Sequence, residues 1–437
     1  MKILYVSQYF PPETAAPAAR VAELSRIWAH SGHQVTVLTG FPHHPTGKVP
    51  KEYRRKLYRL FMHDDRDGVS VRRTWLIPLP NRKSWERMLT YASFCVSAAC
   101  RGVFLGKPDV VIATSPQLLV GLAGLVIAKF KRIPFVFEVR DLWPESLEAV
   151  GVSGGKSAVM RALGWVAGML YRRSTHVVVV THAFKEHLER QWGVPSAKIS
   201  VVVNGVDRGL FAPKVPDAGV IQEFNLQGRF VVGYIGTMGN AHGPETLVAA
   251  AEILKQADPE VLFLVVGEGA EKEQFSRAVH QKGLDNVRIA PGQPRARVPD
   301  LISAVQVCVV LLKNSKLFQT VIPTKLLEFM SSGRPVVLAA GGEAAGLVKN
   351  AGAGICTPPE NPQALAHAIL DLKTDPARLR ECGIRGIDFI ARTLTREQTA
   401  ETYISVLSGV LGKPATNGSG IGPEDSHSPR TAEGAAE

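Results

Sequence analysis

The feature that most constrains the fold is a regular alternation of short apolar runs with longer helical stretches along almost the whole chain. In the first half the predicted strands are residues 2–7, 34–39, 69–74, 110–113, 135–139, 176–180 and 199–203, and the predicted helices are 18–31, 83–104, 117–131, 155–173 and 183–191. Strands that alternate with helices are typical of parallel sheets covered on both faces. This half is therefore predicted to be a doubly wound α/β domain.

A second series of the same kind begins at residue 230. Its predicted strands are 230–236, 262–266, 287–289, 307–311 and 335–339, and its predicted helices are 245–256, 271–282, 298–304, 323–332, 362–374 and 395–411. Since 437 residues exceed one typical core, two domains are expected. We predict Rossmann-like domains over 1–210 and 211–394, a helix at 395–411 that crosses back to the first domain, and a disordered tail at 412–437. Two such domains face a central cleft at the carboxyl ends of their strands, where ligands bind.

The charge is strongly basic, with a formal net charge of +12 and a pI near 9.5. Lysines and arginines crowd the first third, and apolar residues accompany them between Arg82 and Val96. A helix of this kind can lie on an anionic membrane surface, or it can face the core and carry a basic rim. Both interpretations stay open. No recognised nucleic-acid-binding module is present, so we expect no nucleic acid partner.

Three further features predict a cytoplasmic protein, associated at most peripherally with the inner face of the membrane. The chain enters a strand at residue 2, which leaves no room for a signal peptide. The longest apolar stretch, 118–130, is too short to span a bilayer. The five cysteines are scattered and lack metal-ligand spacing, so we expect reduced thiols and no metal.

The helix at 323–332 offers the clearest candidate site. Pro323 opens it and Gly333 follows it, as is typical of helix ends. Lys325 and Glu328 are three residues apart and so share one face, which we expect to be exposed. A helix N-terminus attracts phosphate, and Lys325 would add a full charge, while Glu328 can accept hydrogen bonds from sugar hydroxyls. The alternative is an ordinary surface ion pair.

Glycine-rich loops follow the predicted strands of the second half and are candidates for holding a phosphate sugar. The first loop contains Gly236, Thr237, Gly239 and His242; the next two contain Gly267, Glu268 and Gly269, and then Gly292. Glycine lets backbone N–H groups approach an anion closely. The spacing differs from GxGxxG, which argues against a dinucleotide, and a plain βα turn is the alternative for each loop. A later loop, 340–343, is expected to be flexible.

In the first half, polar groups gather after two predicted strands. Glu13 and Arg20 follow the first strand, and Arg140, Asp141 and Glu145 follow the strand at 135–139. Acid, base and aromatic groups at a strand end suggest a polar sugar or phosphate site. A Pro-stiffened loop and an internal Arg140–Asp141 ion pair are the competing interpretations.

These motifs resemble the family-4 retaining glycosyltransferases of the GT-B architecture. The resemblance is carried by Asn204-Gly205-Val206-Asp207, Val266-Gly267-Glu268-Gly269 and Pro323-Thr324-Lys325-Leu326-Leu327-Glu328. The run Val139-Arg140-Asp141-Leu142-Trp143-Pro144-Glu145-Ser146 and the opening Ser7-Gln8-Tyr9-Phe10-Pro11-Pro12-Glu13 narrow it to the WbuB-like branch, which is associated with N-acetyl-L-fucosamine transfer. The similarity spans about residues 1–410.

The resemblance implies that a nucleotide-sugar donor binds the second domain, and we expect this donor to be UDP-linked. It also implies a saccharide or polyprenyl-diphosphate-linked acceptor on the first domain, within O-antigen, capsule or other surface polysaccharide biosynthesis. The first glutamate of the family's glutamate pair falls on Thr320 here, and the family's usual first-domain histidine corresponds to Arg140. We expect Lys325, Glu328 and Asp141 to carry catalysis, without a metal or other cofactor.

Two rival functions remain. A nucleotide-sugar 2-epimerase would share the architecture and the donor loops, and it would convert the donor without an acceptor. A non-catalytic saccharide-binding scaffold is the other, because the first glutamate of the family pair is missing.

Overall fold

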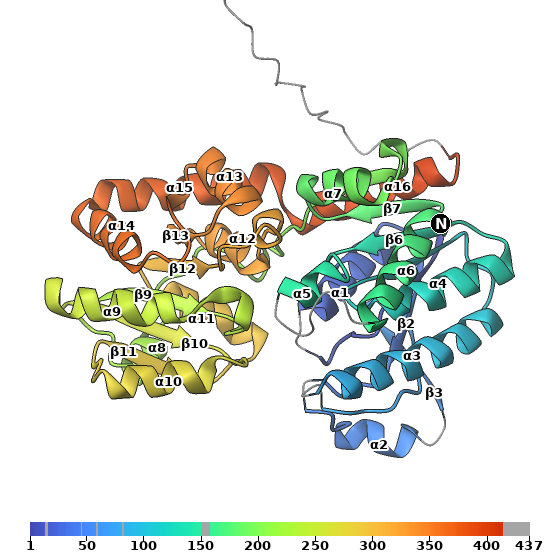
Figure 1. Ribbon diagram of the computed structural model, residues 1–437, viewed down its shortest axis with the longest axis horizontal. Coiled ribbons are helices and arrows are strands. Elements are labelled where there is room, and N and C mark those ends of the chain that lie inside the picture. The colour runs from blue at the N-terminus through green and yellow to red at the C-terminus, as the bar shows by residue number, and fades with distance from the viewer. Residues whose placement is uncertain (14–15, 45, 58–59, 81–82, 150–157, 414–437) are drawn as a thin grey trace, which may run out of the picture.

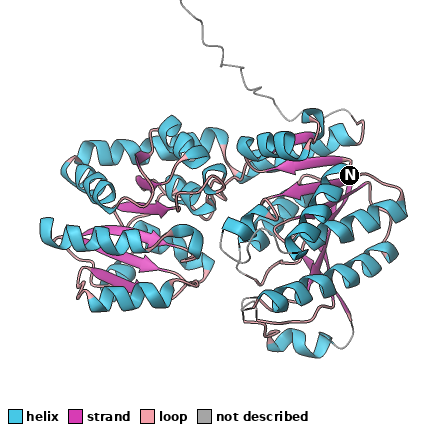
Figure 2. Cartoon of the chain, in the orientation of Figure 1, coloured by secondary structure: helices cyan, strands magenta, loops and turns pink. Residues whose placement is uncertain are grey.

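The structure is a computed structural model that describes residues 1–13, 16–44, 46–57, 60–80, 83–149 and 158–413 (Figure 1). The tail predicted to be disordered lies almost wholly outside these residues, as does the predicted start of the helix at 155. The described chain forms two α/β domains, each built on its own sheet (Figure 2). This confirms the predicted fold class.

The first domain contains an eight-stranded sheet in the order β3-β4-β2-β1-β5-β6-β7-β8. Its strands are β1 (Lys2–Val6), β2 (Gln34–Gly40), β3 (Phe61–Arg66), β4 (Val69–Thr74), β5 (Val110–Thr114), β6 (Phe135–Val139), β7 (His176–Val179) and β8 (Ile199–Val201). All neighbours pair in parallel except β3 and β4. The carboxyl ends of β1, β5 and β6, which are adjacent, therefore meet at one edge.

Side chains on alternate strand positions enter two different cores. Leu4 and Val6 pack beneath three helices, α3 (Ser84–Phe104), α4 (Leu118–Lys131) and α6 (Ala158–Arg173). Ile3 and Tyr5 pack beneath α1 (Ala16–His30) and the last helix, α16 (Arg396–Val410). The helices of this domain are α1 (Ala16–His30), α2 (Lys51–Leu57), α3 (Ser84–Phe104), α4 (Leu118–Lys131), α5 (Glu145–Ala149), α6 (Ala158–Arg173) and α7 (His182–Trp192). The sheet is thus covered on both faces, as parallel strands require.

The second domain has a six-stranded parallel sheet in the order β11-β10-β9-β12-β13-β14. Its strands are β9 (Phe230–Ile235), β10 (Val261–Val266), β11 (Val287–Ala290), β12 (Val307–Leu311), β13 (Val336–Ala339) and β14 (Gly354–Thr357). Its helices are α8 (Ala218–Glu223), α9 (Glu245–Ala257), α10 (Lys272–Gln281), α11 (Val298–Ser303), α12 (Thr324–Ser331), α13 (Gly342–Ala351), α14 (Pro362–Thr374) and α15 (Pro376–Thr393).

The last helix, α16 (Arg396–Val410), packs on α1 of the first domain (Figure 1). Tyr403 and Leu407 are fully buried there, and the Trp28 indole N–H donates to the Ala400 carbonyl at 3.0 Å. At the crossing point a Cβ on Gly205 would lie 2.2 Å from the Thr395 carbonyl, so only glycine fits. The chain therefore closes the first domain with its last described helix.

Several elements were not predicted. The strand β3 was missed because its sequence, FMHDDR, is polar and its side chains are largely exposed. The Asp67-Gly68 turn that joins it to β4 has φ of 50° and 78°, and such a pair is the strongest short signal for a hairpin. The prediction of a flexible loop at 340–343 was wrong in part, because α13 begins at Gly342. Also missed were α2, α5, α8, α15 and β14.

Candidate functional site

The first turn of α12 carries a buried cation. Leu326 and Leu327 are fully buried in the core and hold the helix in place. The Lys325 Nζ lies 4.2 Å from the centre of the Tyr234 ring, and it is buried without a hydrogen-bond partner among the described residues. Burial lowers the pKa of Lys325 to about 7, although the nearby Glu328 carboxylate acts to raise it. Such an ammonium can be stabilised by an anionic ligand.

The loop after β9 meets this lysine directly. Gly236 has a φ of 139°, and a Cβ there would lie 3.2 Å from Lys325 Cδ and 3.7 Å from Nζ. Any side chain at this position would be strained and would crowd the ammonium. The tertiary structure thus brings together Gly236 and Lys325, which lie 89 residues apart in the sequence.

The glycines after β10 are explained by close backbone contact with the same loop. A Cβ on Gly267 would lie 1.9 Å from the Gly236 carbonyl oxygen, and one on Gly269 would lie 2.0 Å from the Met238 carbonyl oxygen. Met238 is itself fully buried. These contacts exclude any larger residue at Gly267 and Gly269, which gives the weak GxG signal a structural basis.

The other predicted groups of the β9 loop differ in their surroundings. Thr237 is exposed, and its carbonyl accepts a hydrogen bond from the Tyr234 hydroxyl at 2.8 Å. The His242 Nδ1 lies 3.3 Å from both the backbone nitrogen and the carbonyl oxygen of Gly239. Burial and the Lys325 ammonium lower the pKa of His242 to about 3. His242 is therefore neutral near pH 7 and adds no charge to the site.

Glu328 is buried, so the expectation that it shares an exposed face with Lys325 was wrong. Its carboxylate accepts a hydrogen bond from Arg295 Nη1 at 2.9 Å. Arg295 also donates to Glu23 of the first domain at 3.2 Å, and Glu23 accepts in turn from Arg396 at 2.7 Å. Burial raises the pKa of Glu328, and Arg295 opposes this effect. The sequence analysis missed Arg295 and Glu23, because only the tertiary structure pairs them.

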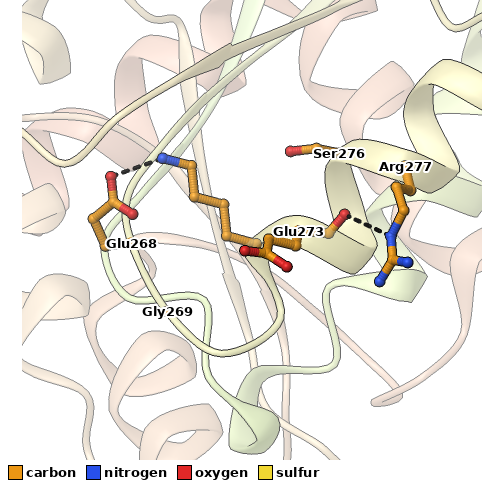
Figure 3. Close-up of a pocket in the computed structure, with 6 residues that line it drawn as sticks. Glu268, Gly269, Glu273, Ser276 and Arg277 are labelled. Carbon is orange, nitrogen blue, oxygen red and sulfur yellow. Dashed lines mark hydrogen bonds and ion pairs between the residues drawn. The ribbon is translucent and has the colours of Figure 1, made fainter. Parts of the chain in front are cut away.

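Glu268, in the loop that follows β10, contacts the start of α10 and the backbone of Gly292 (Figure 3 shows Glu268). Glu268 Oε1 accepts from Lys272 Nζ at 2.7 Å and from the Gly292 backbone N–H at 3.0 Å. An open depression of about 600 Å³ adjoins them, lined by Glu268, Gly269, Lys272, Glu273, Ser276 and Arg277. Neither Lys325 nor Glu328 lines it, so this depression is peripheral to the cationic site.

In the first domain, Glu13 occupies a loop that is held by its own carboxylate. Glu13 accepts backbone hydrogen bonds from His43 and His44, both at 3.0 Å, and from Phe10 at 3.4 Å. Burial raises the pKa of Glu13 to about 7, although these hydrogen bonds act to lower it. It can therefore hold or release a proton near neutral pH. The Nε2 atom of His43 is buried beside it without a partner among the described residues.

Arg20, predicted to meet an acceptor, lies in the interior of the domain. It is 1% exposed and donates to Glu138 Oε1 at 3.0 and 2.8 Å, and also to the Asn204 side chain. Glu138, which the sequence analysis missed, accepts from the Tyr5 hydroxyl as well, at 2.6 Å. These contacts make Arg20 a positioning residue that ties β6 to the turn at Asn204.

Arg140 and Asp141 follow β6 and are fixed by one hydroxyl. The Ser115 Oγ accepts from the Arg140 backbone N–H at 2.7 Å and from that of Asp141 at 3.3 Å. The Asp141 carboxylate accepts a hydrogen bond from the Ser146 hydroxyl. Burial raises the pKa of Asp141, although this hydrogen bond acts to lower it. Among the described residues, no hydrogen bond or ion pair joins the Arg140 and Asp141 side chains. Burial and the neighbouring Arg20 lower the pKa of Arg140 to about 10.

Glu145 and Gln8 complete the polar groups at this edge. Glu145 Oε1 accepts from His187 Nε2 at 3.0 Å and from the Trp192 indole at 3.3 Å, so it ties α5 to α7. Gln8, which follows β1, is fully buried, and both polar atoms of its amide lack a partner among the described residues. In the sequence, the only indication that Gln8 could contact a ligand was its position after the first predicted strand. An unpartnered buried amide is unfavourable unless a ligand pairs with it.

Within the described ranges, no group of three or more His, Cys, Asp or Glu side chains can hold a metal ion. Lys325, at the start of α12, brings a positive charge to the second-domain site. The segment before this helix reaches the first domain, since the Thr181 hydroxyl donates to the Thr320 carbonyl at 2.8 Å. A ligand at Lys325 would thus lie beside the domain interface.

Comparisons with known proteins agree with this architecture. The glycosyl transferase 4-like domain matches residues 16–205, and the glycosyl transferases group 1 domain matches residues 221–388, so that together they cover most of the chain. WcaI of Escherichia coli K12, which is named as a colanic acid biosynthesis glycosyl transferase, is 24% identical to this chain over 424 residues. The aligned region covers 94% of this chain and 100% of WcaI.

Two solved structures share the fold. Sucrose-phosphate synthase from Thermosynechococcus elongatus superposes with a TM-score of 0.74 at 21% identity, over 94% of this chain and 99% of that one. HepE from Anabaena, in complex with UDP and glucose, gives a TM-score of 0.69 at 18% identity, over 93% of this chain and 99% of that one. Since both domain families are glycosyl transferases and their order and fold are those of GT-B enzymes, the chain belongs to the glycosyltransferases of the GT-B architecture.

Proposed function

We propose that this glycosyltransferase moves a sugar, with retention of configuration, from a nucleotide-diphosphate sugar to a saccharide or lipid-linked saccharide. The observation that carries the proposal is the Lys325 ammonium at the start of α12, which faces Gly236 and is buried without a hydrogen-bond partner among the described residues. An ammonium, the N-terminal end of a helix and a glycine loop together suit a diphosphate. The name of one relative supports a role in polysaccharide biosynthesis, since WcaI is named as a colanic acid biosynthesis glycosyl transferase. We infer surface polysaccharide assembly.

In the proposed reaction the bond between the anomeric carbon and the β-phosphate oxygen breaks, and a bond from that carbon to the acceptor oxygen forms. Negative charge develops on the departing diphosphate, where Lys325 and the α12 N–H groups stabilise it. The acceptor arrives on the face that the phosphate leaves, and its proton passes to the departing phosphate oxygen. Asp141 orients the acceptor hydroxyl, and Glu328, held by Arg295, accepts from the donor's sugar hydroxyls.

The donor is inferred to be UDP-linked, because HepE, of the same fold, was solved with UDP and glucose. The WbuB-like motifs favour an N-acetylated deoxyhexosamine as the transferred sugar. Since Lys325 supplies positive charge at the diphosphate, we propose that transfer needs no metal ion. Activity that survives EDTA would support this point, and activity restored only by a divalent cation would contradict it.

The decisive experiment incubates the protein with UDP-, GDP- and dTDP-sugars, with and without lipid-linked acceptors, and identifies the products by mass spectrometry. We expect transfer that depends on the acceptor and a loss of about 100-fold or more in kcat for Lys325→Ala. The exposed Lys349 on α13 offers the matched control, Lys349→Ala, with unchanged kcat. Conversion of the donor without an acceptor would instead indicate an epimerase, and no turnover with any substrate would indicate a scaffold.

A further inference from the structure

The guanidinium of Arg140 lies at the carboxyl end of β6, and the part of the chain that the structure describes offers it no hydrogen-bond partner. Two of its three nitrogens, Nε and Nη1, are buried, and neither has a hydrogen-bond partner among the described residues. The residue as a whole keeps partial exposure, so part of it still borders solvent. Its backbone is fixed by the 2.7 Å hydrogen bond to Ser115, which holds the side chain at this edge of the sheet.

The carboxylates that act on Arg140 or lie near it are engaged elsewhere. Glu138 is paired with Arg20 at 2.8 Å and accepts from the Tyr5 hydroxyl at 2.6 Å. Asp141 accepts from the Ser146 hydroxyl. These acidic groups thus form structural bonds, and among the described residues none gives the Arg140 guanidinium a hydrogen bond or ion pair, although the Glu138 charge attracts it.

An unpaired buried cation is costly, and a second cation makes it more so. Arg20 is close enough to repel Arg140, and Arg396 acts in the same direction from the start of α16. One nitrogen of Arg396, Nη1, is also buried without a partner in the described part of the chain. Guanidinium groups bind carboxylate and phosphate through strong, charge-assisted hydrogen bonds. A bound anion would therefore supply hydrogen-bond acceptors for the guanidinium nitrogens of Arg140.

We propose that Arg140 binds an anionic group, a carboxylate or a phosphate, carried by a substrate of the transfer reaction. The proposal rests on the proposed function, because β6 of the first domain ends where an acceptor or the donor sugar would lie. The anion is either the phosphate of the acceptor or the carboxylate of an acidic donor sugar such as a uronic acid; the second source would replace the neutral N-acetylated deoxyhexosamine proposed above. These two sources share one chemistry, and separate measurements distinguish them.

The donor arm measures binding of UDP, UDP-glucose and UDP-glucuronic acid by titration calorimetry, since the two sugars differ only at C6. The acceptor arm compares transfer to a saccharide on polyprenyl diphosphate with transfer to the same saccharide on a neutral alkyl chain. We expect a preference of about tenfold or more for the acidic member in one arm, which Arg140→Gln removes and Arg140→Lys partly keeps. The affinity for UDP itself should stay unchanged.

The exposed Arg132, at the end of α4, offers a control of the same chemistry. The Arg132→Gln variant should keep the full preference. The proposal would be overturned if the wild-type protein showed no preference for the acidic substrate in either arm. It would also be overturned if Arg140→Gln weakened binding or transfer equally for the acidic and the neutral substrate. The proposed function fails separately if Lys325→Ala binds UDP as tightly as the wild type, and that result is independent of the Arg140 variants.

Stability separates ligand binding from a structural role. Because the guanidinium lacks partners, we expect Arg140→Gln to melt no lower than the wild type. A clearly lower melting temperature together with an unaltered substrate preference would assign Arg140 to the fold instead.

Discussion

The Lys325 ammonium shows how one residue acquires its properties from two levels of structure. Its neighbours in sequence place it in the first turn of a helix, where N–H groups are free. Its burial against Tyr234 and Gly236 comes from the β9 loop. Because burial lowers its pKa to about 7, the lysine is half charged near neutral pH and responds to a bound anion.

This pKa predicts how donor binding depends on pH. Above about pH 7 the free protein loses the Lys325 proton, so the affinity for UDP should fall by about tenfold per pH unit at most between pH 7 and 9. Binding at pH 8 should take up a proton, which calorimetry detects as a heat that depends on the buffer's ionisation enthalpy. The Lys325→Met variant should lose both effects. A flat affinity over this range would contradict a charged contact.

The same lysine should weaken the unliganded protein. A lysine pKa that is lower in the folded state than the usual 10.5 destabilises folding fully below the folded pKa of about 7, and the effect fades as the pH rises toward 10.5. Lys325→Met is therefore expected to raise the unfolding free energy by about 1–4 kcal/mol at pH 6 and by less at pH 9. Denaturant unfolding at both pH values checks the trend.

At the scale of elements, three neighbouring helices of the first domain form a surface that combines apolar and basic groups. The outer sides of α3, α4 and α6, which pack against one another, expose Trp85, Leu89, Val96, Phe104, Val126, Phe130, Val159 and Trp165. Exposed basic residues accompany them: Lys83, Lys107, Lys129, Arg132, Arg161, Arg172 and Arg173. Within the described residues no helix is long and apolar enough to cross a bilayer. We propose that this surface rests on an anionic membrane.

Vesicle sedimentation tests the membrane proposal. The protein should bind vesicles that contain phosphatidylglycerol and not vesicles of phosphatidylcholine alone, and binding should fall as salt rises. Replacing Phe104 and Phe130, which are 82% and 69% exposed, by serine should weaken binding by about tenfold. Ile384, exposed on α15 of the second domain, gives the control Ile384→Ser. Equal binding to both vesicle types would rule out recognition of anionic lipid.

At the scale of the whole molecule, Glu23 links the two domains to the candidate donor site. It accepts from Arg396 at 2.7 Å and from Arg295 at 3.2 Å, and Arg295 in turn holds Glu328. The Arg295 guanidinium also lies over the Phe211 ring, 5.0 Å from its centre. The orientation of Glu328 therefore depends on a side chain from the opposite domain.

Glu23→Gln should loosen this link, because it leaves two largely buried guanidinium groups without their charged partner. We expect a loss of about 1–3 kcal/mol in unfolding free energy, and a raised KM for the donor with little change in kcat. Glu252, whose exposed ion pair with Lys282 lies within one domain, offers the control Glu252→Gln, with a loss of about 1 kcal/mol or less. A change in stability without a change in KM would show that the link is only structural.

The sequence by itself determined the two parallel sheets, since apolar runs alternating with helices can bury their faces in few other ways. It also placed the glycine loops after β9 and β10 and the basic start of α12. Only the tertiary structure decided the environment of each group. Lys325 is buried without a hydrogen-bond partner among the described residues, Glu328 is buried against Arg295, and Arg20 is enclosed by Glu138 and Asn204. Local pattern sets which face a residue shares, but burial and charge pairing arise from segments that are remote along the chain.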